Sequence, residues 1–132
     1  MKFVSIRIIT ADIKRLVGFY KQVTGCPPAW FGEDFAEIAM PSCTLAIGST
    51  RTLQLFEAGD TRAEANRSAI LEFLVNDVDA EFERLKPVLD DIVQQPKTLP
   101  WGNRSLLFRD PDGALVNLFT PATPEARRKF GL

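Results

Sequence analysis

Four polar residues lie at matched places in the two halves of this chain, within apolar stretches that we expect to form strands. Gln54 and Asn117 are the first matched pair, in the similar runs LQLF at 53–56 and VNLF at 116–119. Buried amides hydrogen-bond to each other or to a buried water, or they bind the polar atoms of a ligand. The sequence leaves both alternatives open.

Arg7 and Glu72 form the second matched pair, because they are 65 residues apart, the same spacing as Asp12 and Asp77. An ion pair between them would compensate two partly buried charges, which are costly when left alone. Alternatively, Arg7 binds the carboxylate of an anionic ligand.

Three large aromatic residues, Trp30, Phe31 and Trp101, lie in expected loops that precede interior strands. Such residues pack at the rim of a core, or they line the mouth of a cavity and stack on a flat or cationic ligand.

The chain contains no histidine. This excludes serine and cysteine hydrolases that use a histidine base, and it removes the commonest transition-metal ligand. Cys26 and Cys43 have no cluster of positive charge nearby and are interpreted as structural. Glu57 and Glu37 are the carboxylates nearest to the polar strand positions. Alternation points Glu57 away from Gln54 into solvent and leaves the direction of Glu37 open, and a general base is the weaker interpretation of both.

Length and charge limit the remaining classes. A chain of 132 residues with a net charge of −1 indicates one domain and gives no reason to expect nucleic acid or a membrane as a partner. Two cysteines are too few for a disulfide framework, which favours a reducing compartment. The N-terminus does not resemble a signal peptide, and no apolar run is long enough for a membrane span, so we expect a cytoplasmic protein.

Periodicity predicts the same elements twice. In the first half we expect strands at 2–10, 35–40, 43–47 and 52–56, and a helix at 13–23 that Asp12 caps and Gly25 ends. In the second half we expect strands at 69–75, 92–94, 106–108 and 115–119, and a helix that starts after Asp77. The DPDG sequence at 110–113 predicts a tight turn between the last two strands.

This repeat predicts an α+β fold of two pseudo-symmetric β-α-β-β-β modules. We expect a single domain, 1–132, with modules 1–57 and 69–121, a linker at 58–68 and a C-terminal tail at 122–132. One helix covers one face of each mixed sheet, and we expect the other faces to enclose a trough or open barrel. The candidate ligand-binding residues are Ser5, Arg7, Trp30, Gln54, Phe56, Glu72, Trp101, Asn117 and Phe119.

The segments ITADIKRLVGFYKQVTG and FRDPDGALVNLF, within this repeat, resemble the vicinal oxygen chelate superfamily of glyoxalase I, bleomycin-resistance proteins and extradiol dioxygenases. The resemblance covers nearly the whole chain. It implies paired modules whose sheets enclose a cavity, and frequently a homodimer.

The resemblance also implies where metal-dependent members place their ligands, usually histidine or glutamate on the first and last strands of each half. Those places fall here on Ser5, Gln54, Ile70 (or Ala69 with a one-residue slip) and Asn117. A hydroxyl, two amides and an alkyl group make a very poor divalent-metal site, so we expect no metal and no cofactor.

The sequence therefore favours a metal-free protein that binds a small organic ligand in the trough, as a homodimer. The alternatives are a metal-dependent enzyme of the glyoxalase or dioxygenase type that uses glutamates placed elsewhere, and a non-catalytic interaction domain with a filled trough.

Overall fold

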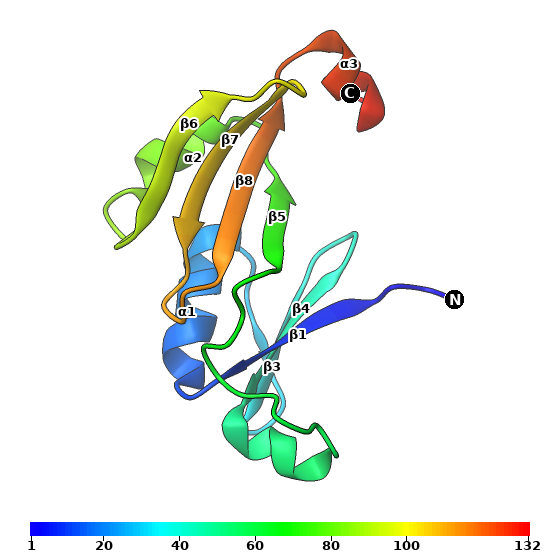
Figure 1. Cartoon of the computed structure of the whole chain (residues 1–132), viewed down its shortest axis with the longest axis vertical. Coiled ribbons are helices and arrows are strands. Elements are labelled where there is room, and N and C mark those ends of the chain that lie inside the picture. The colour runs from blue at the N-terminus through cyan, green and yellow to red at the C-terminus, as the bar shows by residue number, and fades with distance from the viewer. The chain divides into compact units, whose positions relative to one another are not determined.

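A computed structural model describes all residues, 1–132. The chain forms two compact units, Met1–Asn66 and Arg67–Leu132. Each unit contains a four-stranded mixed sheet and a helix that packs against it (Figure 1). This is the predicted α+β fold of two β-α-β-β-β modules. No helix in either unit is long and apolar enough to cross a membrane.

The first unit contains sheet A. Its elements are β1 (Ser5–Thr10), α1 (Ile13–Thr24), β2 (Ala29–Trp30), β3 (Phe35–Ala39), β4 (Thr44–Ser49) and the 3-10 helix η1 (Thr50–Leu55). The strand order is β1-β4-β3-β2, with β1 parallel to β4 and the other pairs antiparallel.

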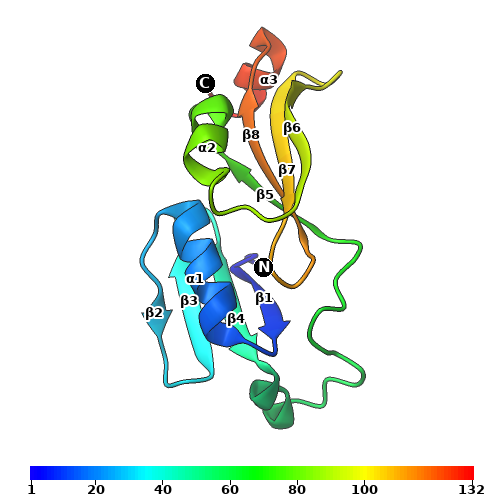
Figure 2. The same cartoon turned by 90° about the vertical axis from the view of Figure 1, so that its left-hand side faces the viewer.

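The predicted ends of α1 are confirmed. The Asp12 carboxylate accepts a hydrogen bond from the Arg15 backbone amide, and Gly25 ends the helix in the left-handed region at φ 69°. The helix α1 lies against sheet A (Figure 2). Its buried side chains recur at helical spacing; they are Ile13, Leu16, Val17, Tyr20 and Val23.

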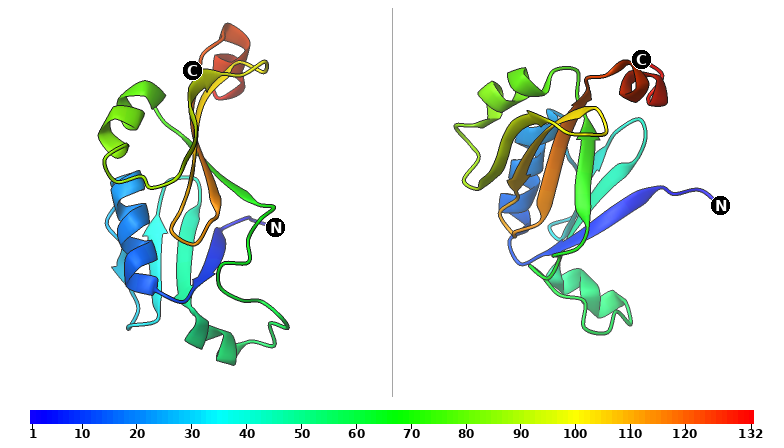
Figure 3. Two further views of the ribbon diagram at one scale, coloured as in Figure 1. Left: turned by 60° about the vertical axis from the view of Figure 1, so that its left-hand side comes forward. Right: turned by 45° about the horizontal axis from the view of Figure 1, so that its top comes forward.

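The second unit contains sheet B. Its elements are β5 (Ile70–Leu74), α2 (Val78–Leu85), β6 (Ile92–Thr98), β7 (Asn103–Arg109), β8 (Leu115–Pro121) and α3 (Pro124–Lys129). The strand order β5-β8-β7-β6 repeats that of sheet A, and β5 is parallel to β8 (Figure 3). The C-terminal tail contains α3, which the Thr123 hydroxyl caps.

The helices α1 and α2 each cover one face of the sheet in their own unit. Register and burial place Leu71, Val116 and Leu118 on the covered face of sheet B, as the alternation of the sequence predicts. We call the opposite face of each sheet its free face. On sheet B the free face carries the alternate residues of each strand: Ile70, Glu72 and Leu74; Asn103, Ser105, Leu107 and Arg109; Leu115, Asn117 and Phe119. The predicted trough stays a prediction.

The prediction of a strand at 52–56 is wrong, because residues 52–55 belong to the 3-10 helix η1. The Thr52 hydroxyl donates to the Ser49 carbonyl at 2.7 Å, which closes a local turn directly after β4. A Cβ atom on Gly48 would lie 2.9 Å from Thr52 Oγ1, so the glycine makes room for this turn. The fourth strand of the unit is instead β2, which the sequence predicts as loop.

The prediction that the strand at 92–94 is followed by a loop is also wrong, because β6 continues through Pro96 to Thr98. β6 is the edge strand of sheet B, and its pairing with β7 shifts register twice. A proline fits this position because an edge strand leaves amide positions unpaired.

The turn between β7 and β8 is held by the side chain of Asp110. Its Oδ1 atom accepts hydrogen bonds from the backbone amides of Asp112 and Ala114, both at 2.9 Å. Asp110 and Ala114 are both buried, so the Ala114 amide has no ready access to water as an alternative acceptor.

Replacing Asp110 with alanine leaves both amides without this acceptor. We expect Asp110→Ala to lower the free energy of unfolding by about 1–3 kcal/mol, and Asp110→Asn to lower it less. Urea unfolding followed by circular dichroism measures both. The control Asp60→Ala, at an exposed position, should change stability by less than about 0.5 kcal/mol, and an equal effect of the three variants would contradict the role of Asp110.

Candidate functional site

Glu72 and Asn117 lie opposite each other on β5 and β8, on the free face of sheet B. Asn117 Nδ2 donates a hydrogen bond to Glu72 Oε2 at 2.8 Å. Glu72 is exposed, whereas only 8% of Asn117 is exposed, and the buried Phe119 follows on the same face. The sequence singles out all three residues, and the structure places them on one surface.

The amide of Asn117 has a defined orientation. An ionised carboxylate only accepts hydrogen bonds, so the amide nitrogen must face Glu72 and the amide oxygen must face elsewhere. This oxygen, Oδ1, is buried and has no hydrogen-bond partner. A buried acceptor without a donor is costly and marks a place where a ligand can supply the missing hydrogen bond.

Arg7 lies on the free face of sheet A between two aromatic rings. Its guanidinium carbon is 4.6 Å from the ring centre of Phe35 and 5.3 Å from that of Phe56. Ser5 lies on the same face, two residues before Arg7, and is exposed. The cation–π contacts stabilise the position of the guanidinium and are compatible with anion binding by its N–H groups. The predicted ion pair of Arg7 with Glu72 stays a prediction.

Gln54 does not occupy a strand position equivalent to that of Asn117. It lies in η1 and is exposed, beyond the end of β4. Asn117 is paired with Glu72, and the residue paired with Arg7 is Ala46. The match of Gln54 to Asn117 is therefore wrong as a structural equivalence, and the residue that corresponds to Asn117 in the first unit is Ala46.

The two tryptophans that the sequence places in loops, Trp30 and Trp101, belong neither to the Glu72–Asn117 pair nor to the group of Arg7, Phe35 and Phe56. Trp30 forms part of the short strand β2, and Trp101 lies in the tight turn between β6 and β7, where the Gly102 amide donates to the Leu99 carbonyl at 2.9 Å. Both are exposed.

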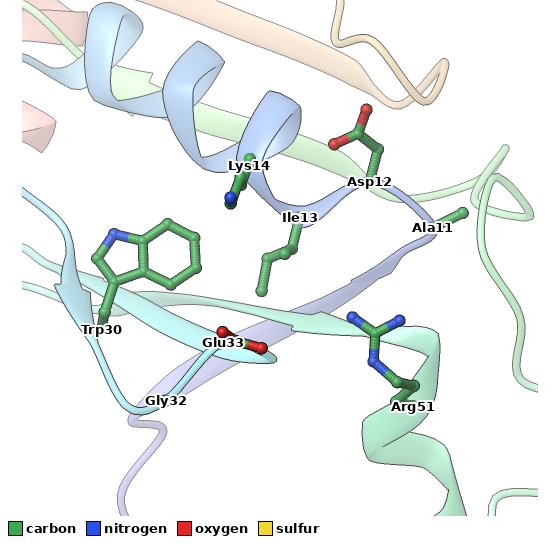
Figure 4. Close-up of a pocket in the computed structure, with 8 residues that line it drawn as sticks. All are labelled: Ala11, Asp12, Ile13, Lys14, Trp30, Gly32, Glu33 and Arg51. Atoms are coloured by element: carbon green, nitrogen blue, oxygen red, sulfur yellow. The ribbon is translucent and has the colours of Figure 1, made fainter.

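A pocket of about 540 Å³ opens in the first unit beside Trp30 (Figure 4). The start of α1, the turn before β3 and η1 form its walls; the lining residues are Ala11, Asp12, Ile13, Lys14, Trp30, Gly32, Glu33 and Arg51. Apart from Trp30, none of the predicted ligand-binding residues lines it. Charges of both signs and the indole make this pocket a mixed polar and aromatic surface.

Arg51 of this pocket is held by Asp34. Its Nε atom donates to Asp34 Oδ1 at 2.7 Å, and the Ser49 hydroxyl donates to the same oxygen at 2.7 Å. The hydrogen bond from Arg51, followed by that from Ser49, holds the pKa of Asp34 below its ordinary value of 3.8. Sequence patterns give no signal for this cluster, because Asp34 is 15 residues from Ser49 and 17 from Arg51 and meets them only in the folded unit.

The positions that the resemblance implies for metal ligands do not form a carboxylate or imidazole set. Ser5 lies on sheet A, Ile70 and Asn117 lie on sheet B, and Gln54 lies in η1. No group of three or more histidine, cysteine, aspartate or glutamate side chains that could hold a metal ion is present.

Residues 2–118 match the sequence model described as the Glyoxalase/Bleomycin resistance protein/Dioxygenase superfamily. The YraH protein of Bacillus subtilis (strain 168) is 28% identical over 125 residues, covering 90% of this chain and 98% of YraH.

Solved structures share the fold at low sequence identity. A glyoxalase/bleomycin resistance protein/dioxygenase family enzyme from Burkholderia phytofirmans PsJN has a TM-score of 0.78 and 15% identity, covering 92% of this chain and 99% of that one. A glyoxalase/bleomycin resistance protein/dioxygenase from Nocardioides has a TM-score of 0.77 and 19% identity, with coverage of 94% and 85%. TioX from Micromonospora sp. ML1 has a TM-score of 0.71 and 21% identity, with coverage of 92% and 99%.

The Asp34–Arg51 contact predicts a pH dependence. Because the pKa of Asp34 is lowered in the folded unit, its contribution to stability is present above the ordinary pKa of 3.8 and is lost as the pH falls through the lower folded value. We expect NMR titration to give Asp34 a midpoint below 3.8 that rises in Arg51→Gln. Asp79, whose pKa is lowered by Arg104, is the internal control and should titrate unchanged in that variant.

Proposed function

Because the chain belongs to the glyoxalase/bleomycin resistance protein/dioxygenase superfamily, we propose that it is a metal-free protein that binds a small organic molecule. The observation that carries this proposal is the Glu72–Asn117 pair on the free face of sheet B. It combines an exposed carboxylate with a buried amide oxygen that has no donor. Ligand sites typically combine an apolar surface with a few such polar groups, and the ring of Phe119 lies on the same face here.

The chemistry of these residues supports binding without a metal. Divalent cations in proteins are held by several carboxylate or imidazole groups. On the free face of sheet B the paired strands β5 and β8 offer one carboxylate, Glu72, and Asn117 already donates a hydrogen bond to it. The implied ligand positions on these strands are an alkyl group, Ile70, and an amide, Asn117.

Thermal-shift measurements against a library of aromatic, anionic and cationic metabolites test the proposal. We expect at least one compound to raise the melting temperature equally with and without EDTA, because no metal takes part. The double variant Glu72→Gln with Asn117→Ala should abolish this shift, whereas Gln54→Ala, outside the strand site, should preserve it.

Two results would contradict the proposal. Stoichiometric metal in the purified protein, with a shift that EDTA abolishes, would favour the metal-dependent enzyme of the glyoxalase or dioxygenase type. A protein that binds no compound in the library would favour the non-catalytic interaction domain.

We also propose that the protein is a homodimer. β1 is an edge strand of sheet A, and the two residues before it are apolar and exposed, with 70% of Phe3 and 60% of Val4 accessible to solvent. Open strand edges with apolar side chains favour association with another chain. A second copy presents the same surface, so a symmetric dimer buries these residues on both copies.

Val4→Lys places a charge at this edge and is expected to shift the protein toward the monomer. Size-exclusion chromatography with light scattering measures the mass of each species. The matched control is Val88→Lys, at an exposed position of the second unit, which should leave the mass unchanged. A wild-type protein that is monomeric at high concentration would contradict the dimer.

A further inference from the structure

The free face of sheet B contains three buried polar atoms without a hydrogen-bond partner: Asn103 Oδ1, Ser105 Oγ and Asn117 Oδ1. Asn103 and Ser105 are alternate residues of β7, and Ser105 is paired with Phe119, two residues beyond Asn117 on β8. Their side chains therefore share one face of two neighbouring strands. Only 1% of Ser105 and 8% of Asn117 are exposed.

These atoms share one hydrogen-bonding property, because all of them accept. Amide oxygens are acceptors only, and a serine hydroxyl has two acceptor lone pairs besides its proton. The hydrogen bond to Glu72 fixes the orientation of the Asn117 amide and keeps its oxygen as the unpartnered atom. The Glu72 carboxylate adds further acceptor sites and a negative charge at the exposed side of the same cluster.

The cations around this face leave the acceptors unpaired. Arg109 Nη1 donates to the Gly113 carbonyl at 3.0 Å. Lys97 of β6 lies opposite Ser105 of β7, but it does not donate to the Ser105 hydroxyl. Arg104 lies on the other face of β7, where it pairs with Asp79 of α2. Lys129 of α3 lies over the Phe130 ring at 5.5 Å.

An aromatic surface adjoins the acceptors. The ring of Phe119, paired with Ser105, lies 5.3 Å from the ring of Phe130. Aromatic faces attract cations, and Lys129 already occupies one side of this pair. A cationic ligand would find a negative charge, several acceptors and aromatic rings on one surface.

We propose that the free face of sheet B recognises an organic cation with several N–H groups, such as an amidinium, a guanidinium or a primary ammonium. Glu72 binds the charge from the exposed side, and Asn117 Oδ1 and Ser105 Oγ accept N–H groups beneath it. This inference rests on the proposed function and names the class of its ligand.

Benzamidine and benzoate form a matched pair of probes, because they have the same ring and a similar planar group with opposite charge and opposite hydrogen-bonding roles. In ¹H–¹⁵N correlation spectra of the full chain, we expect benzamidine at millimolar concentrations to shift the backbone amides of β5, β7 and β8. Benzoate at the same concentrations should leave them unshifted.

Variants locate the interaction. Glu72→Gln should weaken benzamidine binding about tenfold or more, because it removes a charge-assisted hydrogen bond. Glu83→Gln, on the exposed surface of α2, removes the same charge and should leave the affinity unchanged. Ser105→Ala should weaken binding without lowering the melting temperature, since in the free protein its hydroxyl makes no hydrogen bond that the variant loses.

The possible outcomes separate this inference from the proposed function. Absence of benzamidine shifts at tens of millimolar, equal shifts with benzoate, or undiminished binding by Glu72→Gln would each overturn the cation specificity. A neutral or anionic compound whose thermal shift depends on Glu72 and Asn117 would then leave the proposed function standing. If no compound of any charge depends on these residues, both fail.

Discussion

Each unit contains one helix long enough to cover a sheet face, and this helix fixes which residues of the sheet lie in the core. Apolar side chains of α1 and α2 bury one face of a four-stranded sheet, so alternation along every strand divides its residues between the core and the free face. The covered face of sheet B holds buried apolar residues, among them Leu71, Val116 and Leu118. The free faces carry Arg7 of sheet A and Glu72 and Asn117 of sheet B, and the candidate ligand chemistry depends on this division.

The two units use the same topology for different surfaces. The pairing position of β1 and β4 holds Arg7 and Ala46, whereas the equivalent position of β5 and β8 holds Glu72 and Asn117. The free face of sheet A thus presents a cation between aromatic rings, and that of sheet B presents a carboxylate and unpartnered acceptors. Corresponding strands of the two units therefore carry opposite charges.

Local sequence signals predicted the parts of the fold that local interactions form. The cap at Asp12, the end of α1 at Gly25 and the turn at 110–113 depend on contacts within a few residues, and each is present. The segment at 52–56 has strand-like alternation, but the turn made by Thr52 and Gly48 dominates there. The site shows the same limit: Glu72 and Asn117 were identified by the repeat, whereas Ser105 and the Asp34–Arg51 contact depend on register and on spatial neighbours.

The order of the strands in sheet B has a consequence for the way in which its surface assembles. β6, β7 and β8 are neighbours in both sequence and sheet, so their antiparallel pairs close short loops. β5 reaches β8 only by a parallel crossover, and the hydrogen bond between Glu72 and Asn117 spans 45 residues. Closing this larger loop costs more conformational entropy than forming the turns. The carboxylate therefore belongs to the site only where β5 is paired with β8, so the negative charge of this surface depends on an edge strand.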